Sequence, residues 1–172
     1  MAKQKTAPAP PAPTQLPHKT LILDNGAHTL KAGFSSPDAD IAQDCHVISN
    51  CVARSHRDKR TYIGPELTTE CDDFGELAFR RPVEKGYIVN WESEKAIWER
   101  TLFDKKEWKG RNGLQVEEAG EVSLLLTEQP GATTALQRNA DEMVFEEFGF
   151  GGYARMLGLS VCTSCEGEDR RD

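Results

Sequence analysis

The stretch from Lys19 to Phe34 brings together residue types that can bind a phosphate group and its metal ion. Asp24 ends a short apolar run and can hold a hydrated divalent cation, and Lys31, seven residues later, can neutralise phosphate charge. Between them, Asn25-Gly26 is a strong signal for a tight two-residue hairpin turn with positive φ angles. The pattern predicts a phosphate-binding hairpin, and an ordinary hairpin with an unrelated Asp and Lys is the alternative.

Five further segments have the composition of β-strands. Glu121 to Thr127 is the most apolar run of the chain and predicts a central strand buried on both faces, as in a mostly parallel sheet. Cys45 to Val52 is expected to form one buried or edge strand, and Thr61 to Gly64 a shorter one. Two more short strands are expected at Leu77 to Phe79 and Tyr87 to Val89, on either side of a Pro- and Gly-containing connection.

One helix is marked by its cap and by an apolar stripe. Asn90 is a suitable N-cap for a helix that begins at Trp91. Trp91, Ile97, Trp98 and Leu102 then fall on one face at helical spacing, which is typical of a side packed against the core.

A second helix is expected after the central strand. Leu136 to Phe148 repeats apolar residues at helical intervals, and Thr134 with Gln137 has the spacing of a capping box. Strand, turn and amphipathic helix together predict an α/β fold. Asp104 to Gly120 is polar and is expected to be a surface connection, and no element is predicted from Phe150 onward.

Composition divides the chain into three parts. Residues 1–18 form a Pro- and Ala-rich tail, expected to be a disordered leader rather than a ligand for a proline-reading module. Residues 19–157 form the folded domain, in which residues from about 45 to 80 are expected to be a small inserted lobe, and residues 158–172 are expected to be disordered. The basic run Arg54 to Arg60 predicts a solvated surface loop, with a phosphate or partner patch as the alternative.

The overall charge narrows the class of protein. A formal net charge of −7 and a pI near 5.2 argue against binding nucleic acid through the overall field of the protein. No segment approaches the roughly 20 apolar residues that a membrane helix needs, and the N-terminus lacks the apolar core of a signal peptide. We therefore expect an intracellular protein that does not enter a membrane.

Five cysteines are an odd number, which favours reduced thiols over a disulfide framework. Cys162 and Cys165 have the spacing of metal ligands, but no second pair accompanies them, so we prefer thiols to a zinc site. Cys45, His46 and Cys51 could supply further ligands, yet alternation along a strand would point Cys45 and His46 to opposite faces.

Four motifs in a fixed order resemble the actins and actin-related proteins. They are L-D-N-G-A-H-T-L-K-A-G-F from Leu23, the Asn-Trp-led helix segment Arg81 to Phe103, L-L-L-T-E-Q-P from Leu124, and N-A-D-E-M-V-F-E-E-F from Asn139. The segments S-N-C-V-A-R-S, D-F-G-E-L-A-F-R-R-P and E-K-G-Y-I-V-N-W-E resemble the nuclear actin-related protein 6 group in its fungal form. The resemblance implies the first half of an actin-like (ribonuclease H-like) ATPase fold, over about residues 19–157.

The resemblance also implies a function. It is that of an actin-related scaffold subunit in a Swr-type chromatin-remodelling complex, which exchanges histone H2A for its variant H2A.Z and supports transcriptional regulation. The implied partners are the other subunits and, through them, nucleosomes and histones, in the nucleus with a further cytoplasmic pool. Membranes and direct sequence-specific nucleic-acid binding are not implied. The alternatives are an actin-like ATP-binding cytoskeletal protein, and a truncated fragment without independent activity.

Position by position, the resemblance assigns cofactor binding to six residues of the hairpin. These are Asp24, Asn25, Gly26, Ala27, His28 and Lys31. Asp24 would hold the divalent cation of ATP through water. Ala27 stands where actin has a serine hydroxyl facing phosphate, and His28 stands where actin has glycine, so we expect no hydrolysis and no enzyme. ATP with its cation is expected in a full-length parent rather than in this chain, which ends before a second phosphate hairpin.

Overall fold

The main body of the protein is one mixed β-sheet. The computed structural model describes residues 17, 19–36, 44–104 and 114–158. The sheet has five strands in the order β10-β9-β1-β2-β3. They are β1 (Lys19–Asn25), β2 (Thr29–Phe34), β3 (His46–Ser49), β9 (Val122–Glu128) and β10 (Gly152–Leu157). β9 runs parallel to β1 and β10, whereas β2 is antiparallel to both of its neighbours. The predicted α/β fold and the central place of the apolar strand are confirmed.

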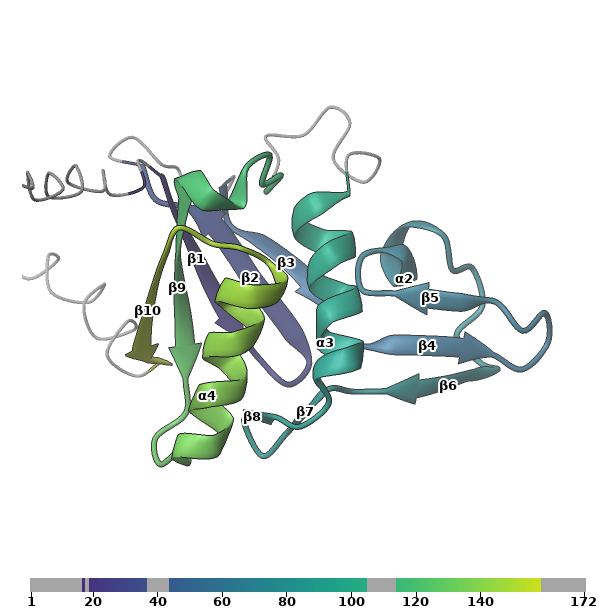
Figure 1. Ribbon diagram of the computed structural model, residues 1–172. Coiled ribbons are helices and arrows are strands. Elements are labelled where there is room, and N and C mark those ends of the chain that lie inside the picture. The colour runs from purple at the N-terminus through teal and green to yellow at the C-terminus, as the bar shows by residue number, and fades with distance from the viewer. Residues whose placement is uncertain (1–16, 18, 37–43, 105–113, 159–172) are drawn as a thin grey trace, which may run out of the picture.

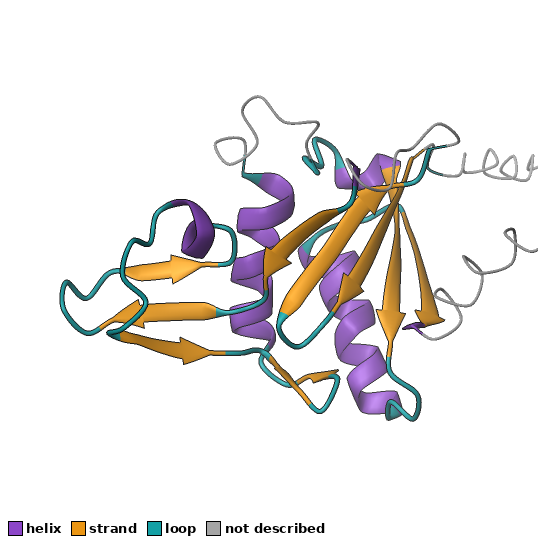
Figure 2. Cartoon of the chain, turned by 180° about the vertical axis from the view of Figure 1, so that it is seen from behind, coloured by secondary structure: helices purple, strands orange, loops and turns teal. Residues whose placement is uncertain are grey.

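Two helices cover one face of this sheet (Figure 1). They are α3 (Trp91–Trp98) and α4 (Thr134–Glu142), and each continues into a π-helical turn, at Glu99–Phe103 and Met143–Glu147. The predicted cap of α3 is confirmed, because the Asn90 side chain accepts a hydrogen bond from the Ser93 amide at 3.0 Å. From behind, the strands of the main sheet stand in front of both helices (Figure 2).

The core lies between the helices and the facing side of the sheet. Alternate residues of β9, Val122, Leu124 and Leu126, are buried there, while Leu125 on the opposite face is only partly buried. Burial on both faces of this strand is therefore not what the structure shows. The reason is that both helices pack on the same side.

An aromatic cluster joins the two helices. The rings of Trp98 and Phe148 lie 5.4 Å apart between centroids, and Phe148 stacks on Phe103 at 5.5 Å. Trp91 meets Trp98 edge to face. The predicted core stripe of α3 is confirmed, since Ile97, Trp98 and Leu102 are buried and Trp91 packs against the core.

A second, three-stranded antiparallel sheet stands beyond α3 (Figure 1). It is formed by β4 (Val52–Ser55), β5 (Thr61–Ile63) and β6 (Leu77–Arg80) in the order β5-β4-β6. The short helix α2 (Glu66–Thr69) packs on it around Cys51, Ala53, Tyr62 and Leu67, and a hairpin of β7 (Val83–Glu84) and β8 (Tyr87–Ile88) leads into α3. The three-part division of the chain stays a prediction.

The segment from Cys45 to Val52 is two strands in different sheets, so the prediction of a single strand is wrong. Asn50 and Cys51 interrupt it. The Asn50 amide donates a hydrogen bond to the carbonyl of His28, and the Cys51 carbonyl accepts one from Gly64. These contacts with two other segments redirect the chain between the sheets.

β10 is a strand that the sequence did not predict. Two glycines obscured the pattern, Gly151 just before the strand and Gly152 at its start, yet both are required by close packing. A Cβ at Gly151 would lie 1.9 Å from the carbonyl oxygen of Gly120, and one at Gly152 would lie 2.4 Å from the Ser123 hydroxyl.

Two smaller predictions are also corrected. Leu114 and Val116, predicted as part of a surface connection, are buried, and the Val116 amide bonds to the Leu102 carbonyl at 2.7 Å. A 3₁₀ turn follows at Ala119–Glu121. The cap of α4 is Thr133 rather than Thr134, because its hydroxyl accepts from the Leu136 amide.

We predict that Leu124→Ala lowers the free energy of unfolding by about 2–5 kcal/mol, because it leaves a cavity between the sheet and the helices. Thermal and urea unfolding followed by circular dichroism would measure this loss. The neighbouring Leu125→Ala is the matched control, and it should cost clearly less because Leu125 is only partly buried. Equal losses would contradict the described core, and a non-cooperative transition in the unmodified chain would show that it does not fold autonomously.

Candidate functional site

The predicted phosphate hairpin is the β1–β2 hairpin of the main sheet. Asp24 pairs with Lys31 and Asn25 with Leu30, so the connection runs through residues 26–28. Asn25 is the last residue of β1, and neither it nor Gly26 has a positive φ angle. The prediction of a two-residue Asn-Gly turn is therefore wrong, although a glycine is still needed. A Cβ on Gly26 would lie 2.6 Å from the carbonyl oxygen of Thr29.

Asp24 and Lys31 lie together at the open side of the hairpin. Lys31 Nζ is 2.8 Å from Asp24 Oδ2, and both side chains are about half exposed. Partial burial acts to raise the pKa of Asp24, but the hydrogen bonds donated by Lys31 and Thr127 and the charge of Lys31 outweigh it, so the pKa lies below its ordinary value. Thr127 Oγ1, at the end of β9, is 2.7 Å from Asp24 Oδ1. The structure thus holds an ionised carboxylate beside an ammonium group.

Asn25 points the other way, into the protein. Its side-chain Oδ1 accepts a hydrogen bond from Trp98 Nε1 at 3.0 Å, and its backbone amide donates to Thr127 Oγ1 at 3.3 Å. The Asn25 side chain therefore anchors the hairpin to α3 instead of standing beside Asp24. Ala27 is partly buried in the connection and His28 is exposed.

Glu94, which the sequence analysis did not select, lies in the interior next to these groups. It is completely buried, and its Oε1 accepts from Trp98 Nε1 at 2.9 Å. The side-chain amide of Asn50 lies 3.4 Å from Glu94 Oε2 and 2.9 Å from the Gly26 carbonyl. Burial raises the pKa of Glu94 to about 7, although the hydrogen bonds around it oppose that rise. Glu94 thus links α3 to the hairpin connection through Asn50.

A sequence signal for Glu94 did exist. It stands three residues after Trp91 and four before Trp98, which places an acidic residue in the middle of an apolar stripe. Asn50 and Thr127 carried weaker signals. Asn50 follows β3 and Thr127 lies near the end of β9. Only the folded chain brings Asn50 to Gly26 and Glu94, 24 and 44 positions away, and Thr127 to Asp24, 103 positions away.

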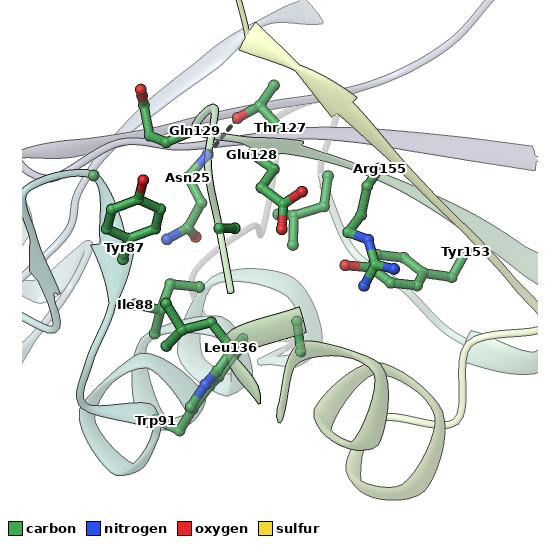
Figure 3. Close-up of a pocket in the computed structure, with 14 residues that line it drawn as sticks. Asn25, Tyr87, Ile88, Trp91, Thr127, Glu128, Gln129, Leu136, Tyr153 and Arg155 are labelled. Carbon is green, nitrogen blue, oxygen red and sulfur yellow. Dashed lines mark hydrogen bonds between the residues drawn. The ribbon is translucent and has the colours of Figure 1, made fainter. Parts of the chain in front are cut away.

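A small cavity lies behind the hairpin, between β9, β10 and the two helices (Figure 3). Its volume is about 50 Å³. Asn25, Trp91 and Tyr153 line it from three different elements, and within the described residues Asn25 Nδ2, Trp91 Nε1 and the Tyr153 hydroxyl are buried without a hydrogen-bond partner. Burial raises the pKa of Tyr153 to about 12, so this hydroxyl stays protonated. A polar cavity of this size is large enough for ordered water.

The six predicted residues can be compared with the needs of a nucleotide phosphate and its cation. Asp24 and Lys31 fit, because a charged carboxylate and a cation stand together on the open side of the hairpin. Gly26 fits a close backbone approach. Ala27 supplies no hydroxyl, His28 adds an exposed ring, and Asn25 is engaged inward. Cofactor binding by these residues stays a prediction.

The other candidate ligands do not gather in the described part of the chain. It contains no group of three or more His, Cys, Asp or Glu side chains that could hold a metal ion. Cys45 is exposed and Cys51 is buried, which raises the pKa of the Cys51 thiol. Cys162 and Cys165 lie outside the described residues. Among the helices of the described segments, none is long and apolar enough to cross a membrane.

We predict that Glu94→Gln flattens the pH dependence of stability. The pKa of Glu94 in the folded state, about 7, lies above its ordinary value of 4.5, so the folded protein gains protons relative to the unfolded chain between these pH values. The stability of the unmodified protein should fall as pH rises through this interval and level off above it, by an amount on the order of 3 kcal/mol from this group alone. The Glu94→Gln protein should lack that component.

The measurement is urea unfolding at a series of pH values for both proteins. Taking the difference between them removes the contribution of every other titrating group. Glu92→Gln, an exposed change on the same helix, is the matched control and should leave the pH dependence unchanged. Parallel curves for the unmodified and Glu94→Gln proteins would refute the raised pKa.

The chain matches a known protein family. The family described as Actin matches residues 15–164. The Actin-like protein arp6 of Aspergillus fumigatus is 47% identical over 164 residues, covering 91% of this chain and 35% of that protein. The Actin-related protein 6 of Neurospora crassa is 49% identical over 155 residues, covering 90% of this chain and 32% of that protein. The Actin-related protein 6 of Oryza sativa subsp. indica is 37% identical over 130 residues, covering 76% of this chain and 27% of that protein.

The chain spans about a third of the length of the fungal relatives it matches. The described sheet and helices are accordingly a partial actin-like fold. Because the family match extends over most of its residues, the chain belongs to the actin family, and its fungal relatives in that family carry the name actin-related protein 6.

Proposed function

We propose that this chain is part of an actin-related scaffold subunit of a Swr-type chromatin-remodelling complex that exchanges histone H2A for H2A.Z. The observation that carries the proposal is the similarity of about nine-tenths of the chain to fungal proteins named actin-related protein 6. The proposed partners are subunits of that complex and, through them, nucleosomes. The proposed location is the nucleus, with a further cytoplasmic pool.

The geometry of the hairpin supports a role without catalysis. Among the polar residues of the predicted site, only Asp24 and Lys31 stand together on the open side of the hairpin, and they already form an ion pair with each other. Ala27 has no hydroxyl to offer a phosphate. In this proposal ATP and its divalent cation bind the longer protein, and their binding free energy stabilises its folded state rather than being used for turnover.

A second candidate is an actin-like, ATP-binding cytoskeletal protein. Membership of the actin family favours it, because the family match over residues 15–164 includes the hairpin and the central strand. The two candidates differ in what the protein assembles with, which is other proteins in the first case and copies of itself in the second.

We predict that an affinity-tagged form of the chain, produced in fungal cells, co-purifies with subunits of a Swr-type remodeller identified by mass spectrometry. The tag alone, expressed at the same level, is the control. Sedimentation of the purified chain with and without Mg-ATP completes the test. Filaments that depend on ATP and salt, in the absence of remodeller subunits, would overturn the scaffold proposal in favour of the second candidate. If the chain neither co-purifies with remodeller subunits nor forms filaments, the result would indicate a fragment without independent activity.

A further inference from the structure

A groove separates the small sheet from α3, away from the predicted phosphate hairpin. Its volume is about 470 Å³. One wall is the N-terminal half of α3, with Glu92, Ser93 and Ala96. The other wall is the face of the small sheet opposite to the one that packs around Ala53 and Tyr62.

The strand register fixes which side chains share this face. Val52 is opposite Ile63 on one side and Arg80 on the other, and Arg54 is opposite Thr61 and Ala78. Directly opposed residues project to the same face of a sheet. The face therefore combines an apolar floor with two guanidinium groups, those of Arg54 and Arg80.

These two arginines are diagonal neighbours on adjacent strands, a relationship that places residues about 7–8 Å apart. Both are exposed. Within the described residues neither has an ion pair, whereas Arg100 bonds to Glu66 and Asp104, and Arg155 bonds to Asp141. The sheet thus holds two like charges close together at a set spacing, and an anionic group placed between them would relieve their repulsion.

The remaining walls restrict the kind of anion. The floor of Val52, Ile63 and Ala78 and the facing Ala96 suit apolar side chains, which the phosphate backbone of a nucleic acid does not offer. Glu92 on the opposite wall and a net charge of −7 also oppose a long polyanion. Carboxylates on a short peptide with neighbouring apolar side chains match both the charges and the floor.

We propose that this groove is a docking site for a partner protein segment in which acidic and apolar residues alternate. Its carboxylates bind Arg54 and Arg80, and its apolar side chains cover the floor of the groove. The proposal does not depend on which complex the chain joins, since it rests on the register and charges of the small sheet.

The test uses the full 172-residue chain and a fluorescein-labelled peptide of alternating Leu and Glu, followed by fluorescence polarisation. Arg54→Gln combined with Arg80→Gln should weaken binding about tenfold or more, and added salt should weaken binding to the unmodified chain. The matched control is Arg57→Gln combined with Arg138→Gln, two exposed arginines on a turn and on α4 outside the groove, which should leave affinity unchanged.

Charge reversal keeps the test decisive if the glutamine variant also loses stability. Arg54→Glu combined with Arg80→Glu should bind a peptide of alternating Leu and Lys better than the acidic peptide. The proposal is overturned if the unmodified chain fails to bind the acidic peptide, binds a Leu and Gln peptide equally well, or prefers duplex DNA. An equal loss in the control pair would also overturn it.

Discussion

A buried carboxyl group holds the main elements of this protein in register. Glu94 has no cationic partner among the described residues, so its burial is tolerated only because Trp98 and Asn50 donate hydrogen bonds to it. The same two side chains bond to Asn25 and to the Gly26 carbonyl. The orientation of α3, the entry into the small sheet and the shape of the hairpin connection are consequently set by one network. A change in any member leaves another buried polar atom without a partner.

The network also explains the chemistry available at the hairpin. Asn25 and Thr127 are engaged in the interior, and this leaves Asp24 and Lys31 as the charged pair on the open side of the hairpin. Thr127 connects the interior to this pair, because its hydroxyl accepts a hydrogen bond from the backbone amide of Asn25 and donates one to Asp24. The structure therefore favours a rigid support for a bound group over a set of residues free to take part in a reaction.

Local patterns were sufficient for much of this fold. The apolar run of β9, the Asn90 cap and the stripe of Ile97, Trp98 and Leu102 each depend on neighbours in the sequence, and each was predicted. What the sequence could not supply were features decided by distant contacts. β10 depends on glycines that fit against Gly120 and Ser123, and the break at Asn50 depends on its contact with His28. Glu94 could have been identified from the sequence, since an acidic residue inside an apolar stripe requires a buried partner.

The edge strand β10 has a consequence for how this polypeptide behaves at high concentration. Along β10, pairing with β9 satisfies one side of the backbone, and no described strand pairs with the other side. Met156 and Leu157 are also exposed there. An open hydrogen-bonding edge that carries apolar side chains is a template for intermolecular β-sheet, and Arg155 on the same strand is the kind of charged residue that keeps such edges apart. The open edge of β10 thus adds a tendency toward intermolecular strand pairing, which the net negative charge of the chain opposes.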